Sequence, residues 1–179
     1  MSSDFDALFD TFRHTVVRLE ALPSYSVGGA EAERIEAWRQ HRPRPERSVR
    51  TSPWLARIAV TTATEGKAWR RVRVVDEPIT EYQRYQLDSY VESQAAGEQV
   101  YVATRRRVDN DGPDFWLFDA GHDTAKAAIM RYDEAGRWLG FDVVTDPVTV
   151  AHLDARVRRV KEQAEPLNAY LAARCSASA

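Results

Sequence analysis

The chain has 179 residues, of which 44% are hydrophobic, and its 25 Lys and Arg nearly balance its 27 Asp and Glu. These values are typical of an ordinary globular domain that needs neither disulfides nor metals to fill its core. A mean hydropathy of -0.51 and the lack of a long apolar run predict no transmembrane helix. The acidic start and the single cysteine, Cys175, predict a cytoplasmic protein without a signal peptide or a disulfide.

The net charge of -2 hides an uneven distribution along the chain. Residues 1–38 carry -4, residues 39–73 carry +8 and residues 74–179 carry -6. Within the basic stretch, arginine alternates with proline in the segment 41–53, which predicts irregular structure but not whether the segment is ordered. These arginines either bind phosphate groups or neutralise the protein's own acids, and the acidic flanks favour neutralisation.

The first half of the chain predicts helices around one strand. Apolar residues at helical spacing predict a helix over residues 3–12, and alternating residues predict a strand over 15–22. A second helix is expected over 30–40, after a glycine pair. A Ser-Pro pair is typical of a helix start and predicts a third helix over 54–64, although the β-branched stretch 58–62 leaves a strand open.

The second half predicts one strand before a helix, and then four strands before a second helix. One helix is expected over 80–95, and another begins after the Asp-Pro pair at 146–147. A hairpin tip is expected at 133–136. The predicted strands span residues 69–75, 99–104, 115–118, 125–132 and 137–144.

This order of elements predicts an α+β fold. We expect a single mixed, mainly antiparallel sheet with helices packed on it and a long C-terminal helix. One globular domain is expected over residues 1–172, followed by a disordered tail over 173–179.

The arginines of the basic stretch are the strongest candidates for binding an anion. Guanidinium groups match phosphate geometry, and neighbouring aromatic rings can stack on a base or another ring. A concave face is expected to bring together Arg44, Arg47, Arg50, Trp69, Arg73, Glu77, Tyr82 and Arg84.

A second set of residues is a candidate for acid/base chemistry. Asp119 and His122 follow an intensely apolar strand and form either an acid/base pair or the solvated end of that strand. Glu20 and Glu77 are carboxylates at strand ends, and with Arg73 or Arg84 they form either a buried polar site or plain ion pairs.

Several familiar motifs are missing from the sequence. It contains no GxGxxG, P-loop, HExxH, CxxC or GxSxG motif, and its four histidines share no metal-ligand spacing. We therefore expect no cofactor and no metal. No helix-turn-helix pair is evident either, so a contact with nucleic acid would use the arginine segment.

Four stretches, taken in order, resemble a known family. They are RVVDEPITEYQR at 73–84, DFWLFD at 114–119, RYDEAGR at 131–137 and the Asp-Pro pair at 146–147. Together they resemble an uncharacterised actinobacterial family of domains of unknown function, over nearly the whole chain. The resemblance implies a gene neighbourhood with helix-turn-helix regulators, and hence such a regulator as a partner. The family is also similar to one half of a phospholipase D-like fold, but the HxK signature is absent here, which implies that this activity is absent.

These observations predict a non-enzymatic cytoplasmic accessory or regulatory protein. It would act through a protein partner or through an anionic ligand bound at the arginine-rich face. The alternative is an enzyme on a phosphorylated or nucleotide-like substrate, with Asp119, His122 or Glu20 as the acid/base and an arginine clamp. Direct binding of nucleic acid is a third hypothesis, and no membrane partner is expected.

Overall fold

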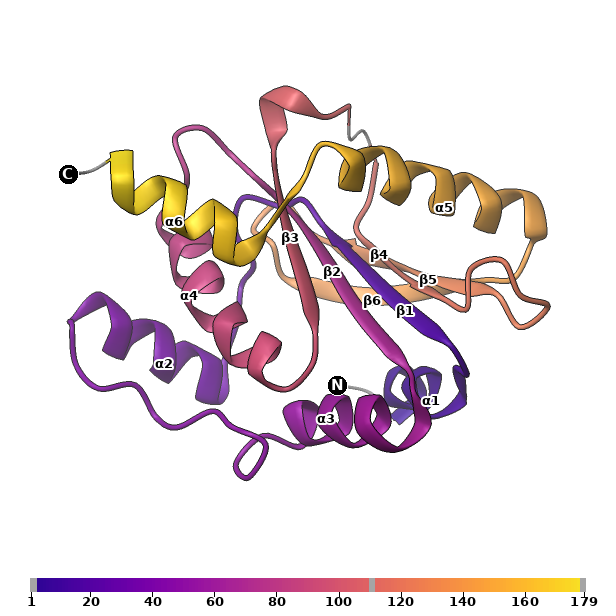
Figure 1. Ribbon diagram of the computed structural model, residues 1–179, viewed down its shortest axis with the longest axis horizontal. Coiled ribbons are helices and arrows are strands. Elements are labelled where there is room, and N and C mark those ends of the chain that lie inside the picture. The colour runs from indigo at the N-terminus through magenta and orange to yellow at the C-terminus, as the bar shows by residue number, and fades with distance from the viewer. Residues whose placement is uncertain (1–2, 110–111, 178–179) are drawn as a thin grey trace.

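The computed structural model describes residues 3–109 and 112–177, which form one seven-stranded sheet with helices on both faces (Figure 1). The strands are β1 (Thr15–Glu20), β2 (Ala68–Val75), β3 (Gln99–Thr104), β4 (Phe115–Phe118), β5 (Lys126–Tyr132), β6 (Trp138–Val144) and β7 (Glu165–Pro166). The helices are α1 (Ser3–Thr11), α2 (Gly29–Arg39), α3 (Pro53–Glu65), α4 (Glu81–Ala95), α5 (Pro147–Glu162) and α6 (Leu167–Ala177), with a short 3-10 turn at Arg105–Arg107.

The sheet has the strand order β6-β5-β4-β1-β2-β3-β7. Strands β1, β2 and β3 are parallel neighbours, joined by α2 with α3 and then by α4. All other pairs, which include the meander β4-β5-β6, are antiparallel. The predicted α+β class and the mixed, mainly antiparallel sheet are therefore confirmed.

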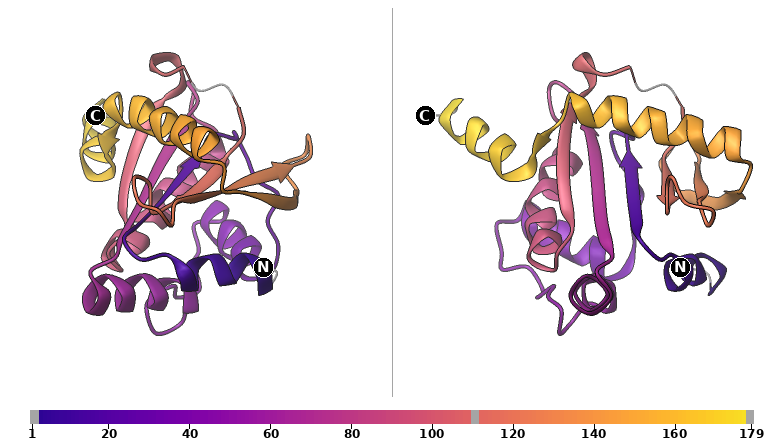
Figure 2. Two further views of the ribbon diagram at one scale, coloured as in Figure 1. Left: turned by 90° about the vertical axis from the view of Figure 1, so that its right-hand side faces the viewer. Right: turned by 45° about the vertical axis from the view of Figure 1, so that its right-hand side comes forward.

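Strand alternation divides the core between the two faces of the sheet. On one face, Val16 of β1 and Trp69 of β2 pack with the phenylalanines of α1 and with Leu55 of α3. On the other face, Leu19 and Val72 pack against α5. Figure 2 shows α5 on the opposite side of the sheet from α1 and α3. Charged residues on the first face of β1 and β2 are thus turned toward α2, α3 and α4.

Residues 54–64 form a helix, although the β-branched stretch 58–62 is also compatible with a strand. Ser52 caps α3 by accepting a hydrogen bond from the Leu55 amide, Pro53 occupies the first turn, and Gly66 ends the helix with a positive φ. Leu55 and Ile58 are then buried on the sheet. Capping and burial of one helical face outweigh the local preference for a strand.

The C-terminal region differs from the prediction at one point. After α5 the chain forms the short strand β7 against β3, and then a separate helix, α6. This helix includes residues 173–177, which were expected in a disordered tail; residues 178 and 179 lie outside the described residues. Its helical structure has a physical basis, because Leu167 is fully buried between α4 and β3, with Tyr170 and Leu171 packed alongside.

The β5-β6 hairpin tip, which was correctly predicted at 133–136, contacts the loop 21–28 that follows β1. The Ser26 amide donates to the Gly136 carbonyl at 2.9 Å. Gly136 has a φ of +74°, and a Cβ atom there would lie 2.6 Å from the Ser24 carbonyl oxygen. Only glycine fits this contact without a shift of the loop.

Within the described residues, no helix has both the length and the apolarity to span a membrane.

We expect Gly136→Ala to lower the free energy of unfolding by more than the matched variant Gly121→Ala. Both glycines have a positive φ, which costs about 1–2 kcal/mol for another residue, but nothing lies within 4 Å of a Cβ at Gly121. The difference between the two variants therefore reports the contact with Ser24. Urea unfolding of both variants measures it, and equal losses would contradict the prediction.

Candidate functional site

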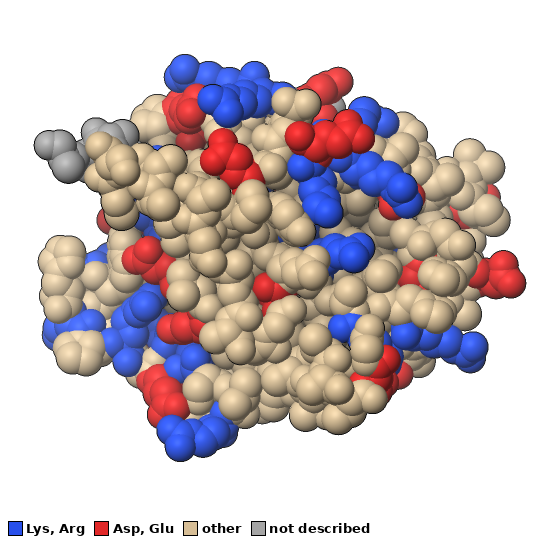
Figure 3. All heavy atoms as spheres, viewed as in Figure 1, with Lys and Arg blue, Asp and Glu red and all other residues tan. Residues whose placement is uncertain are grey.

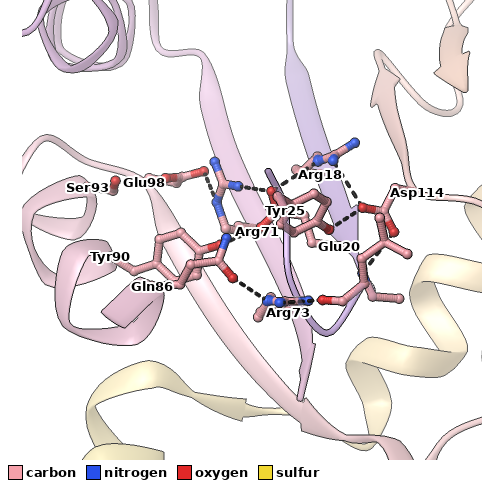
Figure 4. A network of polar contacts seen from close by, with 12 residues as sticks. Arg18, Glu20, Tyr25, Arg71, Arg73, Gln86, Tyr90, Ser93, Glu98 and Asp114 are labelled. Carbon is pink, nitrogen blue, oxygen red and sulfur yellow. Dashed lines mark hydrogen bonds and ion pairs between the residues drawn. The ribbon is translucent and has the colours of Figure 1, made fainter. Parts of the chain in front are cut away.

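A network of buried charged residues lies on the face of the sheet that is turned toward α4 (Figure 4). It begins with Arg18 and Glu20, which alternate with Leu19 in β1, and with Arg71 and Arg73, which alternate with Val72 in β2. Because the two strands are parallel and in register, their charged side chains emerge side by side. The sequence therefore places four charged residues at strand positions that face the interior and are usually apolar.

Glu20 lies at the centre of this network. Its Oε1 atom accepts from Arg18 Nε at 3.3 Å and pairs with Arg71 Nη1 at 2.8 Å. The Tyr90 hydroxyl of α4 donates to Oε2. Burial opposes the charged form of Glu20, but the guanidinium groups of Arg71, Arg18 and Arg73 outweigh it and hold the pKa of Glu20 well below its usual range. Glu20 is therefore a buried anion rather than a proton donor.

Two further carboxylates complete the charge balance. Arg18 Nη2 donates to Asp114 at 3.2 Å, and Arg71 Nε donates to Glu98 at 3.0 Å. With Arg73, the network contains three guanidinium groups and three carboxylates. Its net charge is therefore zero, which is the condition under which such groups tolerate burial.

The same network fixes the loop 21–28. Arg73 is fully buried and donates from Nη2 to the Leu22 carbonyl at 2.6 Å, while its Nε donates to Gln86 at 2.8 Å. Asp114 accepts from the Ala21 amide at 2.9 Å and from the Tyr25 hydroxyl. The loop is thus held in place from β2 and from the start of β4.

Above the network lies a cavity of about 640 Å³, which we call the central cavity. Arg18, Glu20 and Arg71 form its floor, and the loop 21–28 and α4 contribute to its walls. Eight of its nineteen lining residues are aromatic: Phe5, Tyr25, Trp54, Tyr82, Tyr90, Trp116, Tyr132 and Trp138. Its volume lies within the range of small-molecule sites, and such walls suit a flat, partly apolar ligand.

One donor on the floor of the central cavity is unsatisfied. Arg18 is 2% exposed, and its Nη1 atom has no hydrogen-bond partner among the described residues. The guanidinium carbon of Arg18 lies 5.4 Å from the centre of the Trp116 ring. A buried guanidinium nitrogen without an acceptor is unfavourable. A ligand atom that accepts a hydrogen bond would satisfy it.

A second group of arginines lies beside this cavity. Arg34, Arg44 and Arg47 converge on the single carboxylate of Glu92, with N to O distances of 2.5, 3.8 and 3.3 Å. We call these three arginines, with Glu92, the arginine cluster. Three guanidinium groups face one carboxylate, so the cluster carries a local excess of positive charge.

The arginine cluster also contains unsatisfied donors. Arg34 Nε and Arg44 Nη1 are buried without a hydrogen-bond partner in the described part of the chain, and so is the Ser89 hydroxyl. Arg34, Arg47 and Ser89 line a hollow of about 370 Å³ between α2, α4 and the start of α3. Arg47 lines the central cavity as well, so the two spaces adjoin.

Charged side chains of both signs lie on the surface around the basic segment. In Figure 3, Lys and Arg gather over α2 and the segment that follows it, but acidic side chains lie among them. Arg39 pairs with Glu81 at 2.6 Å and Arg50 with Glu46 at 3.4 Å. Arg39 and Arg50 are therefore neutralised within the protein, whereas at the arginine cluster three guanidinium groups share one carboxylate.

The structure brings some of the predicted ligand-binding residues together and separates others. Arg47 and Tyr82 line the central cavity, Arg44 belongs to the arginine cluster, and Arg73 lies buried behind Gln86, which lines the cavity. Trp69 does not contribute, because it is a core residue packed between Phe9 and Phe12. Three others are exposed elsewhere on the surface: Arg50, Glu77 and Arg84.

The three candidate acid/base residues do not form one site. Asp119 accepts from the amides of Arg13, His14 and Thr15 at 2.7–3.0 Å, at the beginning of β1. Glu20 ends the same strand, about 16 Å further along. His122 is exposed, and its ring stacks on that of His14 at 3.9 Å. Asp119 therefore links the chain at the start of β1 to the end of β4, with His122 close by, and Glu20 lies apart from both.

Sequence reasoning did not assign four residues of this site: Arg18, Arg34, Glu92 and Trp116. Arg18 and Arg71 stand at alternating positions of strands, where a charged residue is usually solvated. The available signal was that β1 and β2 are parallel neighbours with charges at matching positions. In the described ranges, no group of three or more His, Cys, Asp and Glu could hold a metal ion.

The fold and the site define an α+β protein with an aromatic cavity above a buried arginine network. The family model described as Domain of unknown function (DUF6879) matches residues 3–172, and the chain belongs to this family. The expected membership of a family of domains of unknown function is thereby confirmed. A search of curated proteins finds no match.

We expect Glu20→Gln to lower the free energy of unfolding by about 3 kcal/mol, because it leaves two buried guanidinium groups without their shared anion. The control is Glu77→Gln, which removes an exposed carboxylate paired with Arg106 at 3.4 Å and should cost less than about 1 kcal/mol. Urea unfolding at neutral pH measures both. A loss at Glu20 no larger than the loss at Glu77 would show that the network is not coupled.

Acid should destabilise the protein in part through Asp119. Burial opposes its charged form, but the amides of His14, Arg13 and Thr15 and the Thr124 hydroxyl hold the pKa of Asp119 below its usual value. The unfolded state then binds a proton first, so this contribution to stability is complete above about pH 4 and is lost as the pH falls further. The stability difference between the native chain and Asp119→Asn should therefore shrink from pH 7 to pH 3 in urea unfolding. A constant difference would contradict this assignment.

Proposed function

We propose that this protein is a non-enzymatic binding module for a small anionic ligand, and that the arginine cluster holds the anion. The observation that carries the proposal is the local charge: Arg34, Arg44 and Arg47 share one carboxylate, Glu92. Ion pairing within the protein would need one carboxylate for each guanidinium. The excess is a reason to expect an external anion.

The unsatisfied donors indicate which anion fits. Among the residues that line the hollow, Arg34 Nε and the Ser89 hydroxyl lack hydrogen-bond partners, and Arg44 Nη1 lacks one outside the hollow. A phosphate group has three free oxygens and up to two charges, so it satisfies more of these donors than a carboxylate does. Phosphate is therefore the chemical group that we assign to the hollow.

The neighbouring carboxyl of Glu31 supports this choice. Glu31 lines the hollow and the central cavity, where it is open to water but surrounded by protein. This desolvation, together with the charge of Glu20, raises the pKa of Glu31. An upward shift favours the neutral form of this carboxyl, which is the form that does not repel a bound anion.

A regulatory role would follow if ligand occupancy is communicated to a partner protein. The partner implied by the resemblance is a helix-turn-helix regulator, in an actinobacterial host. A pull-down from such a lysate, with and without nuclease treatment, checks this part of the proposal. A regulator that is retained after nuclease treatment supports it, whereas recovery of nucleic acid alone favours the third hypothesis.

We expect inorganic phosphate to bind the full chain, and Arg47→Met to weaken that binding about tenfold or more, since a charged hydrogen bond is lost. The control is Arg50→Met in the same segment, because Arg50 is exposed and pairs only with Glu46 among the described residues. Isothermal titration calorimetry measures the three dissociation constants.

Equal affinities for the Arg47 and Arg50 variants, or no phosphate binding at all, would refute the anion site. A single-stranded oligonucleotide is titrated in parallel at several salt concentrations. Affinity that falls steeply with salt for the oligonucleotide, with none for phosphate, would favour a nucleic-acid surface instead.

A further inference from the structure

The central cavity and the hollow at the arginine cluster adjoin, and the combined space has two different chemistries. The cavity and the smaller hollow share the lining residues Glu31, Arg47, Ser52, Gln86 and Tyr90. One side of this space has excess guanidinium charge, and the other has aromatic walls above a charge-balanced floor. A ligand that fills both sides must itself have two parts.

The floor of the central cavity calls for a neutral acceptor. Arg18 already has the charges of Glu20 and Asp114 beside it, so its guanidinium does not need another anion. Its Nη1 atom still lacks an acceptor. A carbonyl oxygen or a ring nitrogen satisfies such a donor without adding charge to a buried network.

The walls of the central cavity call for a planar group. Tyr25, Trp54 and Tyr132 are only partly buried, and Trp138 is 39% exposed, although all four line the cavity. Ring surface that is not packed against protein is available to stack on a ligand. An aliphatic or sugar phosphate would leave this surface uncovered.

From these complementary parts we infer that the ligand is a phosphate monoester attached to a planar heterocycle that accepts hydrogen bonds. The phosphate would occupy the arginine cluster, and the ring would lie in the central cavity within reach of Arg18. This inference rests on the proposed anion site and assigns its ligand class. Nucleoside 5′-monophosphates and a phosphorylated pyridine share this chemistry, and the experiment distinguishes the two sources.

The test is a calorimetric series on the full chain. The ring phosphates are the 5′-monophosphates of adenosine, guanosine, cytidine and uridine, together with pyridoxine 5′-phosphate. The reference compounds are ribose 5-phosphate, inorganic phosphate and the nucleosides without phosphate. At least one ring phosphate should bind tenfold or more tightly than ribose 5-phosphate, since base stacking on aromatic side chains supplies this gain. The compound that binds most tightly identifies the source.

Two variants separate the two parts of the site. Trp138→Leu removes an aromatic ring from the wall of the cavity at an exposed position. This variant should bind the ring phosphate severalfold more weakly and inorganic phosphate with unchanged affinity. Val143→Ala is its control, because Val143 is 49% exposed in the same strand and lines neither space. Arg47→Met should lower the affinity for the ring phosphate and for inorganic phosphate alike.

The series tests the ligand class and the anion site separately. If inorganic phosphate binds through Arg47 but ring phosphates bind no more tightly than ribose 5-phosphate, the ligand class is wrong and the anion site stands. If nucleosides bind as tightly as their phosphates, the two-part ligand is wrong. If no compound in the series binds, both the inference and the anion site are overturned.

Discussion

The rest of the site depends on the contacts of one buried carboxylate, that of Glu20. It lies between Arg18 and Arg71, on adjacent parallel strands, and accepts from Tyr90 of α4. Without an anion at this position, two guanidinium groups would be buried together. Such a network contributes little net stability, because desolvation offsets the attraction between its charges. Its consequence is geometric, since it fixes the position of α4 relative to the sheet and places Arg18 on the floor of the central cavity.

The same network also sets the shape of the walls. Arg73 and Asp114 bind the backbone of the loop that follows β1, and the hairpin tip at Gly136 contacts that loop from the other side. Tyr25 is part of the loop and donates to Asp114. One wall of the cavity is therefore fixed by contacts from β2, from β4 and from the β5-β6 hairpin. A wall that is already ordered lowers the entropic cost of binding a ligand.

The sequence predicted the fold better than the site, for a physical reason. Helix caps and apolar periodicity are local, so the order of elements and the hairpin tip could be predicted, whereas α6 depends on the burial of Leu167 against distant residues. The site depends largely on nonlocal contacts: in the network, Arg18 and Asp114 are separated by 96 positions, and in the arginine cluster, Arg34 and Glu92 are separated by 58. Composition drew attention to Arg44 and Arg47. It gave no means of telling them from Arg50, which differs only in what surrounds it.

The basic segment admitted two interpretations, neutralisation and anion binding, and they apply to different arginines. Arg39 and Arg50 each face a carboxylate on an exposed surface, where the charge is screened and needs no ligand. Around Glu92, however, three guanidinium groups share one carboxylate at positions with buried and unsatisfied nitrogens. Net charge cannot separate these cases, because both contribute equally to it. The relevant quantity is the local ratio of guanidinium groups to carboxylates, and around Glu92, beside the aromatic cavity, that ratio is three to one.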